Sequence, residues 1–96
     1  MTDRAARIAA ALTDRFDPDD LRVVDESARH AGHAGAQAGG ETHYAVLLVA
    51  AAFAGLSRVD RSRAVHEALA AEFAGGLHAL ALTLRTPAEQ AAATAP

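Results

Sequence analysis

Imidazole side chains are the groups in this sequence best suited to bind a metal or to exchange protons near neutral pH. The chain has five histidines, and three of them fall in the stretch HAGHAGAQAGGETH at 30–43. The other two are His66 and His78. The chain has no cysteine, so a bound metal would need histidine, carboxylate or ligands from another molecule.

The first histidine pair has a spacing that can serve a metal. His30 and His33 are three positions apart, and His43 opens the next apolar segment. Together they make a candidate mononuclear zinc site. An HxxH pair without a helix or a second ligand pair is a weak zinc signature, however, and the spacing by itself favours solvated loop histidines.

His78 is the most constrained of the five histidines. It lies in the alternating segment LHALALTL and shares the register of Leu80, Leu82 and Leu84. One interpretation is a partly buried histidine that forms a hydrogen bond with the backbone. The other is a metal ligand that a rigid strand holds at the edge of a sheet. We interpret His66 as structural or solvent-facing.

Enzymatic chemistry finds little support in the remaining residues. Without cysteine there is no thiol nucleophile, and Ser27, Ser57 and Ser62 have no recognisable catalytic setting. Asp25 and Glu26 are neighbours on a predicted strand, so their carboxylates point to opposite faces and cannot readily act as an acid–base pair. We therefore expect a protein that is not an enzyme.

The cationic residues are few, and all nine are arginines. The net charge of −3 argues against strong non-specific binding to nucleic acid. Arg58, Arg61 and Arg63 nevertheless begin a predicted helix, where they could attract phosphate or an acidic surface. The simpler interpretation is a solvated charged face, because Val65, Leu69 and their neighbours form the apolar stripe of that helix.

Apolar periodicity predicts the elements that must position these side chains. They are a helix at 2–16 with Thr2 as its N-cap, strands at 21–27 and 43–50, a helix from a capping box at 57–60 to about 74, a strand at 77–84 and a short helix from 86. The order α-β-β-α-β-α predicts an α/β (α+β) fold with a right-handed crossover and a mixed three-stranded sheet. We expect a single domain over 1–96, with 91–96 frayed.

Four segments together resemble the BolA family of small α/β proteins. They are VVDESARH at 23–30, GGETHYAVLLV at 39–49, FAGLSRVDRSRAVHEALAAEF at 53–73 and GLHALALTLRTPAE at 76–89. The resemblance covers nearly the whole chain. It implies a fold similar to a class II KH domain.

The resemblance also implies a function for the histidines. BolA proteins pair with monothiol glutaredoxins, and the heterodimer can share a [2Fe-2S] cluster to which glutathione and the glutaredoxin supply thiolates. By this resemblance His78 is one ligand, and His30, or His33 as its alternative, is the second. His43 is structural. The resemblance further implies that the isolated chain is a monomer that carries no cofactor. Two histidines can hold one iron of the cluster, and the partner must hold the other.

Some BolA proteins are described as DNA-binding transcriptional regulators, which makes DNA an alternative partner for Arg58, Arg61 and Arg63. The sequence departs from the family pattern there, because Ser62 stands between two arginines where a histidine is common. Gln90 likewise replaces an aromatic residue. Neither departure affects the proposed ligands.

The sequence shows neither a membrane span nor a signal peptide. No apolar run approaches the ~20 residues that a spanning helix needs, and the N-terminal MTDRAARIAAALTDRF has an early acidic residue. We therefore expect a cytoplasmic protein that does not attach to membranes.

Overall fold

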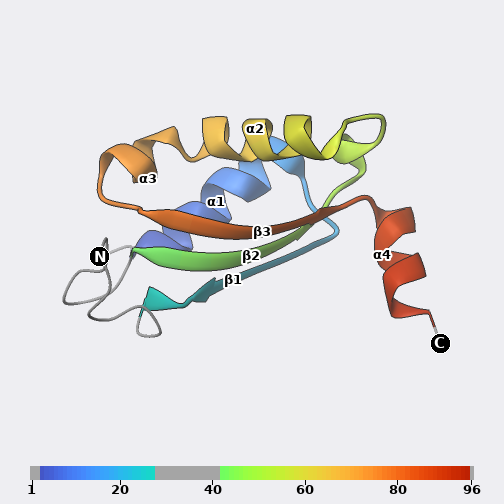
Figure 1. Ribbon diagram of the computed structural model, residues 1–96, viewed down its shortest axis with the longest axis horizontal. Coiled ribbons are helices and arrows are strands. Elements are labelled where there is room, and N and C mark those ends of the chain that lie inside the picture. Colours follow the sequence, from blue (N-terminus) through green and yellow to red (C-terminus); the bar gives the residue numbers. More distant parts are fainter. Residues whose placement is uncertain (1–2, 28–41, 96) are drawn as a thin grey trace.

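A three-stranded sheet with helices packed on one face forms the body of the protein, and the C-terminal helix lies beyond one end of the sheet (Figure 1). The computed structural model describes residues 3–27 and 42–95. Its elements are α1 (Arg4–Phe16), β1 (Asp20–Asp25), β2 (His43–Val49), the 3-10 turn η2 (Ala51–Phe53), α2 (Arg58–Ala68), α3 (Ala70–Ala74), β3 (Ala79–Arg85) and α4 (Pro87–Thr94). The predicted α+β fold class is confirmed. None of the helices in the described ranges is long and apolar enough to span a membrane.

The sheet has the order β1-β2-β3, with β2 in the centre. β1 pairs antiparallel with β2, and β3 pairs parallel with β2 after the crossover through α2 and α3. The mixed sheet is thus as predicted. The parallel pairing has a consequence for the site, because it brings the beginnings of β2 and β3 to the same end of the sheet.

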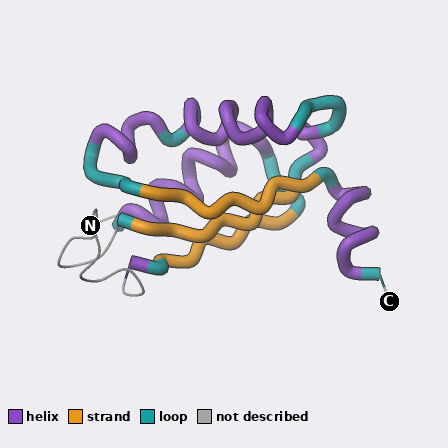
Figure 2. The backbone as a smooth tube through the Cα atoms, viewed as in Figure 1, coloured by secondary structure: helices purple, strands orange, loops and turns teal. Residues whose placement is uncertain are grey.

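The core lies between this sheet and the helices (Figure 2). Amphipathic spacing places Ile8, Leu12 and Phe16 of α1 against the sheet, and all three are buried. The full set of buried hydrophobic residues is Ile8, Leu12, Phe16, Tyr44, Val46, Leu48, Val49, Ala50, Phe53, Val65, Leu69 and Leu77. Phe73 of α3 is only partly buried and packs against this core.

The helix starts follow local hydrogen-bonding rules. Asp3 caps α1, since its carboxylate accepts from the Ala6 N–H at 2.9 Å. The prediction of Thr2 as the cap is therefore wrong, and Thr2 itself lies outside the described residues. The predicted capping box of α4 is confirmed: the Glu89 N–H donates to Thr86 Oγ1, and the Thr86 N–H donates to Glu89 Oε1. α4 reaches Thr94, well into the tail that was expected to fray.

Several predicted boundaries differ from the structure. The first strand ends at Asp25 rather than at residue 27. The single helix expected to reach about residue 74 is divided at Leu69, whose N–H is shared between the carbonyls of Val65 and His66. This shared bond tightens the chain locally while Leu69 stays buried. The last strand begins at Ala79 rather than 77, because a turn with Gly76 at φ +118° precedes it.

Candidate functional site

His43 and His78 lie side by side at the end of the sheet where β2 and β3 begin. Their ring centroids are 5.2 Å apart. The backbone between them is tightly held, since the N–H groups of His78 and Ala79 both donate to the Thr42 carbonyl, at 2.8 and 3.1 Å. A histidine pair on paired backbones is a well-fixed arrangement.

The two imidazoles have different environments. His43 is buried, and its Nδ1 lies 2.9 Å from the Thr42 hydroxyl, in agreement with a structural role. His78 is exposed. The interpretation of His78 as partly buried is wrong, because the residue precedes β3 instead of lying within it. Of this pair, His78 is therefore the one available to a partner.

Ser27 organises the backbone beside this pair. Its buried hydroxyl accepts from the N–H groups of Thr42 and His43, at 2.9 and 3.1 Å, and the Asp25 carboxylate accepts from the Ser27 N–H. Sequence reasoning considered Ser27 only as a nucleophile and missed this role. Short serine side chains that bond nearby backbone are a known signal for such turns.

His30 and His33 lie outside the described residues. The described residues on either side of the segment 28–41 are Ser27 and Thr42, and Thr42 is bonded to both Ser27 and His78. The described residues contain no group of three or more histidine or acidic side chains that could hold a metal, so a metal at His78 would take further ligands from elsewhere.

An ion-pair network anchors the turn that leads to His78. Arg4 is buried, donates from Nη2 to the Gly75 carbonyl at 2.7 Å and pairs through Nε with Glu72 at 3.0 Å. Arg7 also pairs with Glu72 at 3.0 Å. The hydrogen bond from Arg7, with help from Arg4, lowers the pKa of the Glu72 carboxyl. Sequence spacing did not single out Glu72; two arginines three positions apart on α1 were the available signal.

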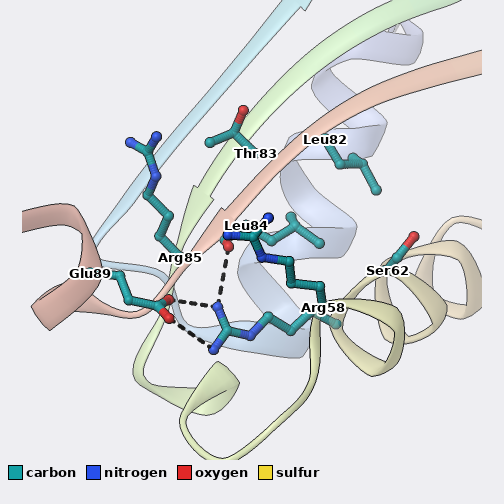
Figure 3. A pocket seen from close by; sticks show the side chains of 8 residues that line it. Arg58, Ser62, Leu82, Thr83, Leu84, Arg85 and Glu89 are labelled. Carbon is teal, nitrogen blue, oxygen red and sulfur yellow. Dashed lines mark hydrogen bonds and ion pairs between the residues drawn. The ribbon is translucent and has the colours of Figure 1, made fainter. Parts of the chain in front are cut away.

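The arginine cluster lies at the opposite end of β3 (Figure 3). Arg61 is buried, which contradicts its expected place on a solvated face. It donates to the carbonyls of Leu56 and Leu84, and its guanidinium binds both carboxylate oxygens of Glu89, at 2.6 and 3.3 Å. The Arg61 hydrogen bond, supported by the Thr86 N–H, lowers the pKa of Glu89 to about 2.

The other polar residues of α2 are more accessible. Arg63 is exposed and lies 3.6 Å from Asp60, whereas Arg58 borders a cavity of about 490 Å³. His66 is exposed, as expected for one of its two interpretations, and its Nδ1 donates to the Ser62 carbonyl. The structure therefore separates the three predicted nucleic-acid arginines: one is internally paired, one pairs on the surface and one faces a cavity.

Comparisons with known proteins identify relatives of this chain. The BolA family model, described as BolA-like protein, matches residues 12–89. Mouse BolA-like protein 1 is 44% identical over 84 residues, which is 88% of this chain and 58% of the mouse protein. The Vibrio cholerae protein named DNA-binding transcriptional regulator BolA is 40% identical over 82 residues, covering 85% of this chain and 74% of that protein. The chain thus spans little more than half the length of the mouse relative.

A solved structure agrees with the sequence matches. The BolA domain of SufE1 from Arabidopsis thaliana superposes with a TM-score of 0.83 at 42% sequence identity, and the alignment covers 93% of this chain and 98% of that domain.

Proposed function

Because this chain belongs to the BolA-like family, we propose that it is an iron–sulfur adaptor that binds a monothiol glutaredoxin. In this proposal His78 and one histidine of the segment 28–41, His30 or His33, provide two ligands to a [2Fe-2S] cluster. The glutaredoxin and glutathione provide the thiolates. The cluster is cargo for transfer or for iron regulation, and the adaptor acts in the cytoplasm.

One observation carries the proposal: His78 is exposed, its backbone is fixed, and the segment bearing His30 and His33 is attached next to it. The N–H of His78 and that of Ala79 converge on Thr42, and Thr42 is tied to Ser27. A ligand whose backbone is already ordered costs little further entropy when it binds. A neighbouring histidine from 28–41 can then complete the adaptor's half of the ligand set.

The chemistry of the donors agrees with a shared cluster. A chain without cysteine supplies no thiolate, while histidines on one iron are an established ligand set for [2Fe-2S] centres. Histidine must be neutral to bind a metal, so protonation near neutral pH would favour release of the cluster. His43 is buried, so its imidazole is less accessible to a cluster than that of the exposed His78.

Anaerobic reconstitution with a monothiol glutaredoxin and glutathione tests the proposal. Visible circular dichroism of the complex should change when His78→Ala is used in place of the wild-type chain, and cluster loss should become faster. His66→Ala is the matched control, because His66 is also exposed but lies on α2. Identical spectra and lifetimes for His78→Ala and wild type would refute the assignment.

The same assay selects between the two loop histidines. His30→Ala and His33→Ala are compared one at a time, and the true ligand is the one whose loss alters the spectrum as much as the loss of His78. A chain in which both single variants behave like wild type, while the double variant fails, would mean that the two residues substitute for one another.

The name of the Vibrio cholerae relative supports a second candidate function, DNA-binding transcriptional regulation. In this candidate Arg58 and Arg63 supply the accessible cations, since Arg61 is bonded to Glu89. A salt-dependent titration with duplex DNA tests the idea: binding should weaken steeply as salt rises. No binding at about 50 mM salt, where electrostatic contacts are strongest, would exclude it.

A further inference from the structure

Within residues 3–27 and 42–95, β3 is an edge strand that pairs with β2 on one side and with no strand on the other. The Ala79 N–H and the Arg85 carbonyl both point to the chain of β2, where they bond Thr42 and Ala50. The Leu84 carbonyl points the other way and accepts from Arg61. Because backbone groups alternate sides along a strand, the N–H and C=O groups of Leu80, Leu82 and Leu84 face away from the sheet.

The cavity beside α2 runs along this edge. It has a volume of about 490 Å³, and its lining includes four consecutive residues of β3, 82–85. Consecutive strand residues alternate between the faces of a sheet, and Figure 3 shows Leu82 and Thr83 on opposite sides of the strand. A hollow that touches both sides lies against the strand edge itself, with α2 as one wall and Glu89 of α4 at one end.

The charge along this edge is positive. Three arginines and one glutamate line the cavity, and the glutamate is already bound by Arg61. Arg85 donates to the neutral side chain of Gln90 at 2.8 Å. No carboxylate in the described ranges forms an ion pair with Arg58 or Arg85. Two guanidiniums are thus available to a negatively charged ligand.

We propose that the β3 edge binds an extended acidic segment of a partner protein as an added strand. The backbone of that segment pairs with Leu80, Leu82 and the Leu84 N–H. Two consecutive acidic residues then point to opposite faces, one toward Arg58 and one toward Arg85. This site lies at the far end of β3 from His78 and does not depend on the iron–sulfur proposal.

The alternatives to a peptide strand fit the edge less well. Nucleic acid would bind the guanidiniums, but it has no alternating N–H and C=O groups that could pair with the backbone of β3. A second copy of this chain, paired edge to edge, would bring two sets of arginines together, and like charges on an edge oppose such pairing. Arg61 also covers the Leu84 carbonyl, which limits the length of edge that a copy could use.

Amide hydrogen exchange of the whole chain tests the proposal. The probe is a capped peptide of sequence Val-Glu-Glu-Val-Thr-Val, and its control carries Lys-Lys in place of Glu-Glu. The acidic peptide should slow exchange at Leu82 and Leu84 by on the order of tenfold. Ala81 and Thr83 should not respond, because their N–H groups face β2. Acidic-peptide binding without protection of Leu82 and Leu84, or equal binding of both peptides, would overturn the proposal.

Charge reversal provides the matched variants. Arg58→Glu and Arg85→Glu should each weaken the binding of the acidic peptide by about tenfold. Arg63→Glu makes the same change on the same helix outside the cavity lining, so its affinity for the peptide should be that of wild type. Equal weakening by all three variants would point to a diffuse charge effect and would contradict a strand-edge site.

Two further measurements distinguish the other occupants. If duplex DNA protects the amides of Leu82 and Leu84 to the same extent as the peptide, the peptide assignment is overturned. Protection of these amides that rises with protein concentration, in the absence of peptide, would assign the edge to a second copy instead.

Discussion

The two ends of β3 present different chemistry on one strand. At its beginning, His78 is exposed beside the buried His43, and backbone hydrogen bonds to Thr42 hold the pair in place. At its end, the buried Arg61 is fixed by charge-assisted bonds to Glu89. The first end presents an exposed imidazole, whereas the second uses the charge of Arg61 for the fold and leaves its flanking arginines accessible.

The side chains that stabilise the fold thus differ from those that are available for binding. A side chain that stabilises the domain is expensive to remove, while an exposed ligand can be removed with little structural cost. Loss of Arg61 should therefore lower the free energy of unfolding, whereas loss of His78 should impair binding and leave that free energy near the wild-type value.

Removing Arg61 should have the largest effect on stability. Arg61→Ala loses the Glu89 pair, the bond to the Leu84 carbonyl and the contact with the Phe53 ring at 5.8 Å. We expect a loss of about 2–3 kcal/mol in the free energy of unfolding, measured by urea denaturation.

The control for this variant is Arg63→Ala, which removes an exposed arginine from the same helix and should cost less than about 0.5 kcal/mol. His78→Ala should be equally mild. A strongly destabilised His78→Ala chain would show that the histidine end is also used for the fold, and the distinction would fail.

Ser27→Ala should weaken the histidine end through its backbone. The buried N–H groups of Thr42 and His43 would lose their hydroxyl acceptor, and leaving buried donors unsatisfied costs about 1–3 kcal/mol. Urea denaturation gives the total loss, and NMR shifts of the His78 N–H report the local change. Ser62→Ala on α2 is the control and should behave like wild type.

Gly76→Ala should have a smaller effect, near 1 kcal/mol, because Gly76 has φ +118° and other residues are strained there. The Cβ would also lie 3.5 Å from Arg4 Nη2. Thermal unfolding checks the cost. A variant as stable as wild type would show that the turn before His78 can relax.

Acid should weaken the arginine end of β3 through Glu89. The pKa of Glu89 lies at about 2, so the stability that this carboxylate provides is present above its ordinary pKa near 4.5 and is lost as pH falls toward 2. Glu89→Gln should flatten this part of the stability–pH curve, as followed by urea denaturation between pH 5 and about 2. An unchanged slope would contradict the Arg61–Glu89 account.

The sequence allowed most of the fold to be predicted, for physical reasons that particular residues illustrate. Leu80, Leu82 and Leu84 alternate with other residues and therefore indicate a strand. Thr86-Pro87, followed by a capping glutamate, indicates the start of a helix. Such local signals predict the order of the elements. The parallel pairing of β2 with β3 then places His43 next to His78. The exposure of His78 was not predictable, because it depends on a turn that delays the strand by two residues.

The buried charges could not be recognised from spacing. Arginine is usually a surface residue, and only the tertiary structure brings Glu89 to Arg61 and Glu72 to Arg4. The same limit applies to Ser27, whose partners Thr42 and His43 lie beyond the segment 28–41. The predicted zinc triple of His30, His33 and His43 stays a prediction, since two of its members are outside the described residues.

The central claim, that His78 binds the shared cluster, is tested most directly by pulsed electron paramagnetic resonance of the reduced complex. The chain is labelled with 15N-histidine, and the glutaredoxin is unlabelled. We predict 15N couplings to the cluster that His66→Ala preserves and from which His78→Ala removes one nitrogen. A wild-type complex without 15N coupling, or a His78→Ala complex with an unchanged spectrum, would contradict the claim.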